Sequence, residues 1–363
     1  MKVVHALPLV LLMASIPSSI NFEAYSITSY DLAYSLNVSN LGPSDALAIP
    51  LRVALLQSWT PHQKVLSRTV LPEPNETYTD ALGNAFALYQ IDQLKPERSF
   101  NVTIRATLEV YSIDYNVDPR NVGEYHPSDS SFANHVIPSK LIESESAEIK
   151  GQARAILAES SFLLDVAFKS YNWVIDNLSF ERLAGELGAL YTYKNRVGDS
   201  AEISNLLVAL LRANRIPAQR ISGWGGTFVM NETYTAAQVA HGWSELYLAN
   251  YGWIPMDPTF GRSQRFDNFL KSDERHIILT KGAGVHLFTR GLYETPFGAA
   301  DVLTSYNIHI LDKATRYVSP AGNVITALFF AVPITVLGLM LVRIRKKPNP
   351  DRPRETPPSQ SAP

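Results

Sequence analysis

Three side chains suited to nucleophilic and acid–base chemistry follow one another along the chain. They are the hydroxyl of Ser200, the imidazole of His241 and the carboxylate of Asp257. Serine hydrolases combine these residue types, and their histidine takes the proton from the attacking oxygen. Each residue also has an ordinary explanation. Serine is a good first residue of a helix, His241 can be the end of a strand, and Asp-Pro-Thr is a common turn.

The segment around Ser200 predicts a buried helix that ends before Pro217, because the residue before a proline is pushed out of the helical region. Asp199 can accept a backbone N–H as N-cap, and Glu202 completes a capping box. Ser200 then meets the free N–H groups and the positive end of the helix dipole, which stabilise an anion. Asn214 is expected to take a left-handed C-cap conformation. Apolar residues line one face of this helix at Ile203, Leu206, Leu207, Leu210 and Leu211.

The segments that carry His241 and Asp257 predict a sheet. Residues 242–248 and 252–256 are expected to be neighbouring antiparallel strands joined by a short turn. His241 would then start one strand and Asp257 would end its partner, within reach of a side-chain hydrogen bond. Residues 221–230 would begin the sheet, and their glycines indicate a mobile or tightly turning segment. Further strands are expected at residues 276–279 and 308–311.

Three blocks of the sequence resemble the core of the transglutaminase-like superfamily, which has the papain-like fold. In that family Gly-x-Cys opens a buried helix that ends in Arg-Ala-x-Gly-Ile-Pro, and a Cys-His-Asp triad forms an acyl-enzyme. Matched position by position, the triad falls on Ser200, His241 and Asp257. The sequence departs from the family at Ser200, which replaces the cysteine, and at Arg215, which replaces a glycine. The blocks are Gly198–Pro217, His241–Tyr247 and Gly252–Thr259.

Composition limits the chemistry of the chain. Its 363 residues contain no cysteine, so disulfides, thiolate metal sites and cysteine nucleophiles are excluded. The net charge of −2 gives no indication of nucleic-acid binding. No cofactor or metal is expected, because the other histidines show no metal-ligand spacing. Beyond residues 1–20 these are His62, His126, His135, His276, His286 and His309.

The rest of the chain predicts an α+β protein with two extracytoplasmic domains. Residues 1–20 are typical of a signal peptide. Short alternating runs over 22–135, among them 51–56, 85–89 and 100–110, predict an immunoglobulin-like or transthyretin-like β-sandwich that acts as a spacer or contacts proteins. A linker would span 136–150 and the transglutaminase-like domain 151–318, with helices at 147–155 and 162–177.

The C-terminal region predicts a membrane anchor. Residues 321–342 are long and apolar enough to cross a bilayer. The basic residues that follow favour a cytoplasmic C-terminus, and 343–363 would be a basic, proline-rich tail. The exported part carries five possible glycosylation sequons, at Asn37, Asn75, Asn101, Asn177 and Asn231.

Three hypotheses about function stay open. In the first, the cleft has lost or nearly lost catalysis and binds proteins, peptides or a surface polymer. In the second, Ser200 works as the nucleophile of a cell-surface amidase, peptidase or acyltransferase. In the third, the fold is a structural surface protein. A helix N-terminus can ionise a thiol but not a hydroxyl, so serine would need His241 to remove its proton during attack.

Overall fold

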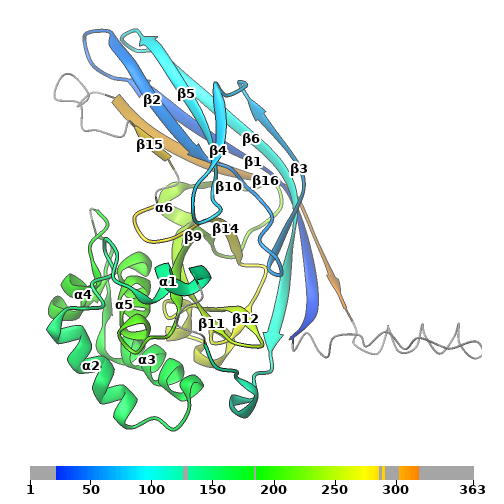
Figure 1. Ribbon diagram of the computed structural model, residues 1–363. Helices are drawn as coiled ribbons and strands as arrows, with labels where there is room; N and C mark the ends of the chain where they lie inside the picture. Colours follow the sequence, from blue (N-terminus) through cyan, green and yellow to red (C-terminus); the bar gives the residue numbers. More distant parts are fainter. Residues whose placement is uncertain (1–21, 126–129, 184, 286–287, 291–301, 319–363) are drawn as a thin grey trace, which may run out of the picture. The chain divides into compact units, whose positions relative to one another are not determined.

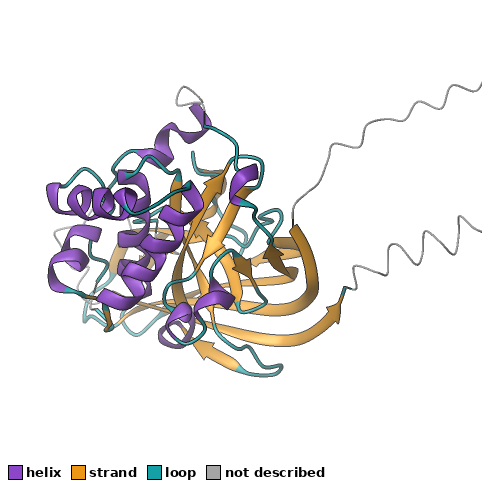
Figure 2. Cartoon of the chain, turned by 90° about the horizontal axis from the view of Figure 1, so that it is seen from below, coloured by secondary structure: helices purple, strands orange, loops and turns teal. Residues whose placement is uncertain are grey.

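The computed structural model describes residues 22–125, 130–183, 185–285, 288–290 and 302–318. The described residues from Phe22 to Tyr317 group into one compact unit. Within this unit the helices gather on one side of the strands (Figure 2). The strand-rich N-terminal region and the mixed core that follows it confirm the predicted α+β class.

Two sheets make up the strand-rich region (Figure 1). Long strand β6 (Ser99–Tyr115) alternates regularly, and its inward residues are all buried: Val102, Ile104, Ala106, Leu108 and Val110. They share one hydrophobic core with residues of the facing sheet. One sheet contains β1 (Phe22–Asn40), β3 (Gln63–Leu71) and β6 (Ser99–Tyr115); the other contains β2 (Ala46–Ala54), β4 (Glu76–Thr79) and β5 (Ala85–Leu94).

The chain returns to these sheets after the core. Strand β16 (Val302–Tyr317) runs antiparallel to β1 from Asn40↔Val302 to Ser26↔Tyr317, and β15 (Phe288–Arg290) pairs with β2. The predicted division assigned residues up to 318 to the second domain, whereas these two strands lie in the sheets of the first. Strand β16 gives the long edge of β1 a hydrogen-bonding partner, which no local sequence pattern indicates.

The core has a four-stranded sheet in the order β12-β11-β9-β14. Its central helix α5 (Ser200–Ala213) packs against β11 and β9, and every residue from Glu202 to Arg212 is buried. The strands are β9 (Ala218–Gly225), β11 (Ala240–Leu248), β12 (Gly252–Met256) and β14 (His276–Lys281). Around α5 lie α2 (Ala147–Ala158), α3 (Leu163–Asn177) and α4 (Ala189–Asn195).

Short elements complete the described chain. They are α1 (Ser130–Val136), β7 (Ser179–Phe180), β8 (Val197–Gly198), β10 (Thr233–Thr235), α6 (Ala236–Val239), β13 (Lys271–Ser272) and the 3-10 turns Pro119–Asn121, Phe260–Arg262 and Arg265–Asn268. Helix α1 begins inside the predicted 22–135 sandwich, and α2 begins inside the predicted 136–150 linker.

Amide side chains of the N-terminal sheets cover the free edge of β14. Gln63 donates to the carbonyl of Ile278 (3.0 Å) and accepts from its N–H (2.8 Å). Asn84 makes the same pair of bonds with Lys281, at 2.9 and 2.7 Å. Each amide takes the place of a neighbouring strand, so the exposed edge of the core sheet is closed.

Two local expectations were wrong. Arg215, with φ of 60°, and not Asn214, takes the left-handed conformation after α5. Gly223 and Gly225 do not form a turn, because both lie within the buried strand β9. A side chain at Gly223 would meet the carbonyl oxygen of Ile277 at 2.1 Å, so glycine there permits close strand contact.

Several predictions fall outside the described residues. They are the signal peptide at 1–20, the membrane helix at 321–342 and the tail at 343–363. Among the helices that are described, none has the length and apolar character to cross a membrane.

Candidate active site

Ser200 lies at the first position of α5, as predicted. The Asp199 carboxylate accepts from the Ala201 N–H at 2.8 Å and also from the Glu202 N–H. The Glu202 side chain in turn accepts from the Asp199 N–H at 3.0 Å, which completes the capping box. The Ser200 Oγ accepts a hydrogen bond from the Gly242 N–H at 3.1 Å. This bond ties the start of the helix to strand β11, beside His241.

Gly242 allows that close approach. A Cβ atom at this position would lie 3.1 Å from the Ala201 Cα and 3.3 Å from the Ser200 carbonyl oxygen. Both contacts are tighter than ordinary van der Waals distances to backbone atoms, which have little room to shift. The first turn of α5 therefore sits directly on the strand that carries His241.

His241 is held in a narrow aromatic slot. Its ring stacks on Phe260, with centroids 4.4 Å apart, and lies 5.7 Å from Trp243. Only 6% of the side chain is exposed. The Nε2 atom hydrogen-bonds to the Asp257 Oδ2 at 2.6 Å, so the predicted contact between the two strand ends is present. Since Asp257 occupies Nε2, Nδ1 is the ring nitrogen left for a substrate or nucleophile.

Asp257 is almost fully bonded. Its Oδ1 accepts from the backbone N–H groups of Thr259 (2.8 Å) and Phe260 (3.0 Å). Burial alone would raise the pKa of Asp257, but the charges and hydrogen bonds of His241 and His276 outweigh it and hold the pKa well below its usual range. The carboxylate is therefore ionised at neutral pH.

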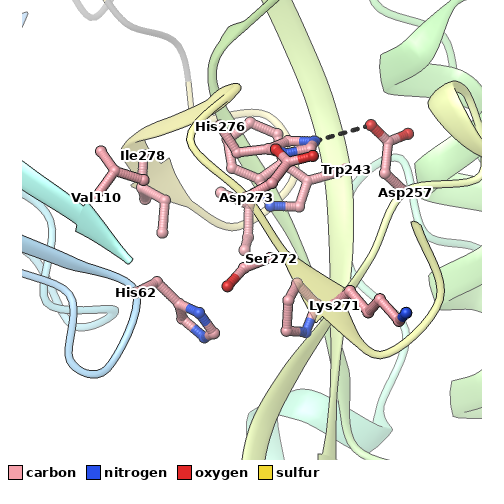
Figure 3. Close-up of a pocket in the computed structure, with 11 residues that line it drawn as sticks. His62, Val110, Trp243, Asp257, Lys271, Ser272, Asp273, His276 and Ile278 are labelled. Carbon is pink, nitrogen blue, oxygen red and sulfur yellow. Dashed lines mark hydrogen bonds and ion pairs between the residues drawn. The ribbon is translucent and has the colours of Figure 1, made fainter. Parts of the chain in front are cut away.

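A second histidine joins this site, which sequence reasoning missed. His276, at the start of β14, bonds through Nε2 to the same Oδ2 of Asp257 at 3.0 Å, and through Nδ1 to Asp273 at 2.7 Å (Figure 3). Burial lowers the pKa of His276, but Asp273 and Asp257 raise it more strongly, to about 9. The only signal in the sequence was its position in a predicted strand, because the approach to Asp257 depends on sheet pairing.

An open cleft lies against Ser200 and His241. Its volume is about 210 Å³. On one wall the buried guanidinium of Arg220 forms an ion pair with Glu186 at 2.8 Å. The other lining side chains include Leu183, Asp199, Glu202, Ser222 and Val285.

Glu202 carries an unusual carboxyl group in this cleft. Burial and the neighbouring Asp199 raise the pKa of Glu202 to about 7. Its oxygens accept from the N–H groups of Asp199 (3.0 Å) and Leu187 (2.9 Å), so it connects the helix start to the loop beside the cleft.

The donor atoms of His241, Asp257 and His276 lie within 4.8 Å of one another and could in principle hold a metal ion. In the structure, the Nε2 atoms of both histidines instead hydrogen-bond to the same carboxylate oxygen, Oδ2 of Asp257. Two ligand atoms that each lie about 2.1 Å from one metal ion, at right angles to each other, are roughly 3 Å apart. The His241 Nε2 and the Asp257 Oδ2 are closer than that, at 2.6 Å. The geometry fits hydrogen bonds, and the expectation of no metal stays a prediction.

The arrangement has the parts for nucleophilic attack, with one gap. No hydrogen bond joins Ser200 to His241, both of which are described. Such bonds are often long before substrate binds.

Comparison with known proteins agrees with this core. Residues 150–258 match the model of the transglutaminase-like superfamily. A putative cysteine protease from Cytophaga hutchinsonii is similar in structure, with a TM-score of 0.50 and 17% identity over 81% of this chain and 93% of that one. The periplasmic domain of TgpA from Pseudomonas aeruginosa aligns at a TM-score of 0.35 and 14% identity, over 68% of this chain and 93% of that one. The comparison with curated proteins gave no match. Residues 150–258 of this chain therefore form a transglutaminase-like superfamily domain.

Proposed function

We propose that the protein carries out acyl transfer on amide bonds of peptides or carboxamide side chains, with Ser200 as the nucleophile. One observation carries this proposal. His241 is fixed through Nε2 by the buried Asp257, and His241 and Ser200 line the same cleft. This is the relation between base and orienting carboxylate that a serine nucleophile requires.

The proposed reaction uses His241 twice. Its Nδ1 takes the Ser200 hydroxyl proton while Oγ bonds to the carbonyl carbon. It then gives that proton to the leaving nitrogen as the C–N bond breaks, which leaves an ester on Ser200. Water or an acceptor amine attacks this ester, with His241 again taking the proton of the attacking group and returning it to Oγ.

The start of α5 supports the same reaction. The Asp199 side chain accepts from the Ala201 N–H, and the Asp199 carbonyl accepts from the Ile203 N–H. The Ser200 N–H is the first backbone N–H group of the helix. Negative charge on the carbonyl oxygen would be stabilised near this N–H by the helix dipole.

Binding without turnover is the second candidate. It is favoured by the absence of a Ser200–His241 hydrogen bond between these two described residues. In that case the same cleft would hold a protein, a peptide or a surface polymer, and Ser200 would contribute only the bond from Gly242.

Three full-length proteins test the two candidates: the natural chain, Ser200→Ala and Ser200→Cys. Because the chain has no cysteine, the Cys variant holds a single thiol. Each is assayed for hydrolysis and amine incorporation on a glutamine-containing peptide library, with mass spectrometry for an acyl group on residue 200. Activity in the natural chain that the Ala variant lacks supports the serine enzyme. Activity in the Cys variant alone would overturn it and leave a binding cleft.

We further propose that the protein is exported and anchored by one C-terminal helix, with its cleft outside the cell and protein or peptide ligands at the surface. The composition of residues 1–20 and 321–342 supports this location. Protease treatment of intact cells should cleave the domain and spare a C-terminal tag. A protein found entirely in the soluble fraction would contradict the anchor.

A further inference from the structure

The Asp257 carboxylate is shared between two imidazoles. Oδ2 lies 2.6 Å from the His241 Nε2 and 3.0 Å from the His276 Nε2. Since Oδ1 is taken by two backbone N–H groups, His276 is one of four donors that fix this carboxylate. Its contact comes from β14, whereas the backbone bonds come from the turn that directly follows Asp257.

His276 is bonded to a carboxylate at each ring nitrogen. Nε2 meets Asp257 at 3.0 Å and Nδ1 meets Asp273 at 2.7 Å. An ionised carboxylate only accepts hydrogen bonds, so both nitrogens must carry protons. This geometry makes the ring an imidazolium cation, with 10% of its side chain exposed.

That cation lies close to His241. The two ring centroids are 5.9 Å apart, and both rings contact Phe260 and Trp243, which exclude water. Two positive charges at this distance repel, so His276 offsets the pull that Asp257 exerts on a proton at His241. A neutral resting histidine is what a serine nucleophile needs from its base, whereas a cysteine thiolate pairs with an imidazolium.

We infer that His276 is a positioning residue that holds the Asp257 carboxylate for His241 and that its positive charge opposes the addition of a proton to His241. The inference rests on the proposed role of His241 as the base. Around His276 the titratable and charged groups are Asp257, Asp273, His241 and Arg275, with His62 and Lys271 lining the same small cavity.

The test uses the full-length Ser200→Cys protein, whose single thiol reports on the neighbouring imidazole. Iodoacetate alkylates a thiolate fastest while that imidazole is protonated, so the upper limit of its pH–rate profile marks loss of the His241 proton. Mass spectrometry follows the modification of residue 200. The pH–rate profile of the Ser200→Cys protein is compared with the profiles of two further proteins that each carry one added substitution. His276→Gln keeps an N–H donor but no charge, and Asp273→Asn keeps the imidazole ring of His276. The control is His309→Gln, on β16, where His309 bonds only to Thr233 among the described residues.

Removing the charge at residue 276 should move the upper limit of the pH–rate profile to higher pH by about one to two units. Charges roughly 6 Å apart in a partly shielded site interact with an energy of that size. Asp273→Asn should shift it in the same direction by less, and the control should not move it. Equal limits in the 276 variant and its parent would overturn the inference. So would unfolding of both the 276 and 273 variants, which would make His276 a structural residue. If the shift appears while the natural chain proves inactive, the proposed function fails and the role of His276 stands.

Discussion

Gly225 and His241 lie so close that a Cβ atom at residue 225 would be 2.5 Å from the Cδ2 of the imidazole. The two residues are on adjacent strands β9 and β11, and only a hydrogen atom at 225 leaves room for the ring in its contact with Asp257. The position of the proposed base therefore depends on a residue that does no chemistry.

Gly225→Ala is expected to displace the His241 ring and lower activity at least tenfold, because misplacement by about 1 Å can cost roughly a hundredfold. Activity and circular dichroism measure the effect. The matched control is Gly151→Ala in helix α2, where a Cβ would meet nothing within 4 Å. That change should leave activity intact and stabilise the helix by roughly 0.5–1 kcal/mol. Full activity in the 225 variant would contradict the steric argument.

Removing the N-cap of α5 should affect both stability and the site. Asp199→Ala loses the acceptor for the Ala201 N–H, at a typical cost of about 1–2 kcal/mol, and frees the first turn that carries Ser200. Urea unfolding and the peptide assay measure the two effects. Ser146→Ala removes the cap of α2 instead. It should cost similar stability and leave activity unchanged, so equal activity losses in both variants would point to global unfolding.

Stability should fall between about pH 6.5 and 9. The neighbouring carboxylates raise the pKa of His276 in the folded protein to about 9, above its ordinary value of 6.5. Such a group stabilises the fold fully below pH 6.5, and the contribution disappears as pH rises through 9, by roughly 3 kcal/mol in total. Urea unfolding at several pH values should show this slope. His276→Gln should flatten this pH dependence, and His309→Gln should leave it unchanged. If His276→Gln also leaves the slope unchanged, the pH dependence comes from other groups.

A buried ion pair joins the core sheet to its covered edge. The Lys281 Nζ lies 2.5 Å from the Glu245 Oε1, and Gln219 donates to the same oxygen at 2.5 Å. Lys281→Met should cost about 3–5 kcal/mol, since it leaves the Glu245 charge buried with little compensation. Adding Glu245→Gln should recover most of that loss. Arg120→Met, at the exposed pair with Asp118, is the control and should show no measurable change. A Lys281→Met protein as stable as the natural chain would contradict this prediction.

The sequence by itself determined the local elements of this protein. Apolar spacing and the Asp199–Glu202 pair predicted α5 with Ser200 as its first residue, and the strand pattern predicted that His241 and Asp257 would meet. These features depend on neighbours a few residues apart, whose periodicity and capping chemistry can be read directly. The presence of serine at position 200, where α5 begins, is likewise a property of the sequence alone.

Tertiary structure decided what depends on distant pairing. The second imidazole bonded to Asp257 is that of His276, which reaches the carboxylate only because β14 joins the sheet beside β9. The room for the His241 ring comes from Gly225. The strand that pairs with β1 is β16, which lies more than 260 residues further along the chain. No local pattern encodes such contacts, because strand edges pair through backbone groups that every residue shares, and packing of the whole unit selects the partner.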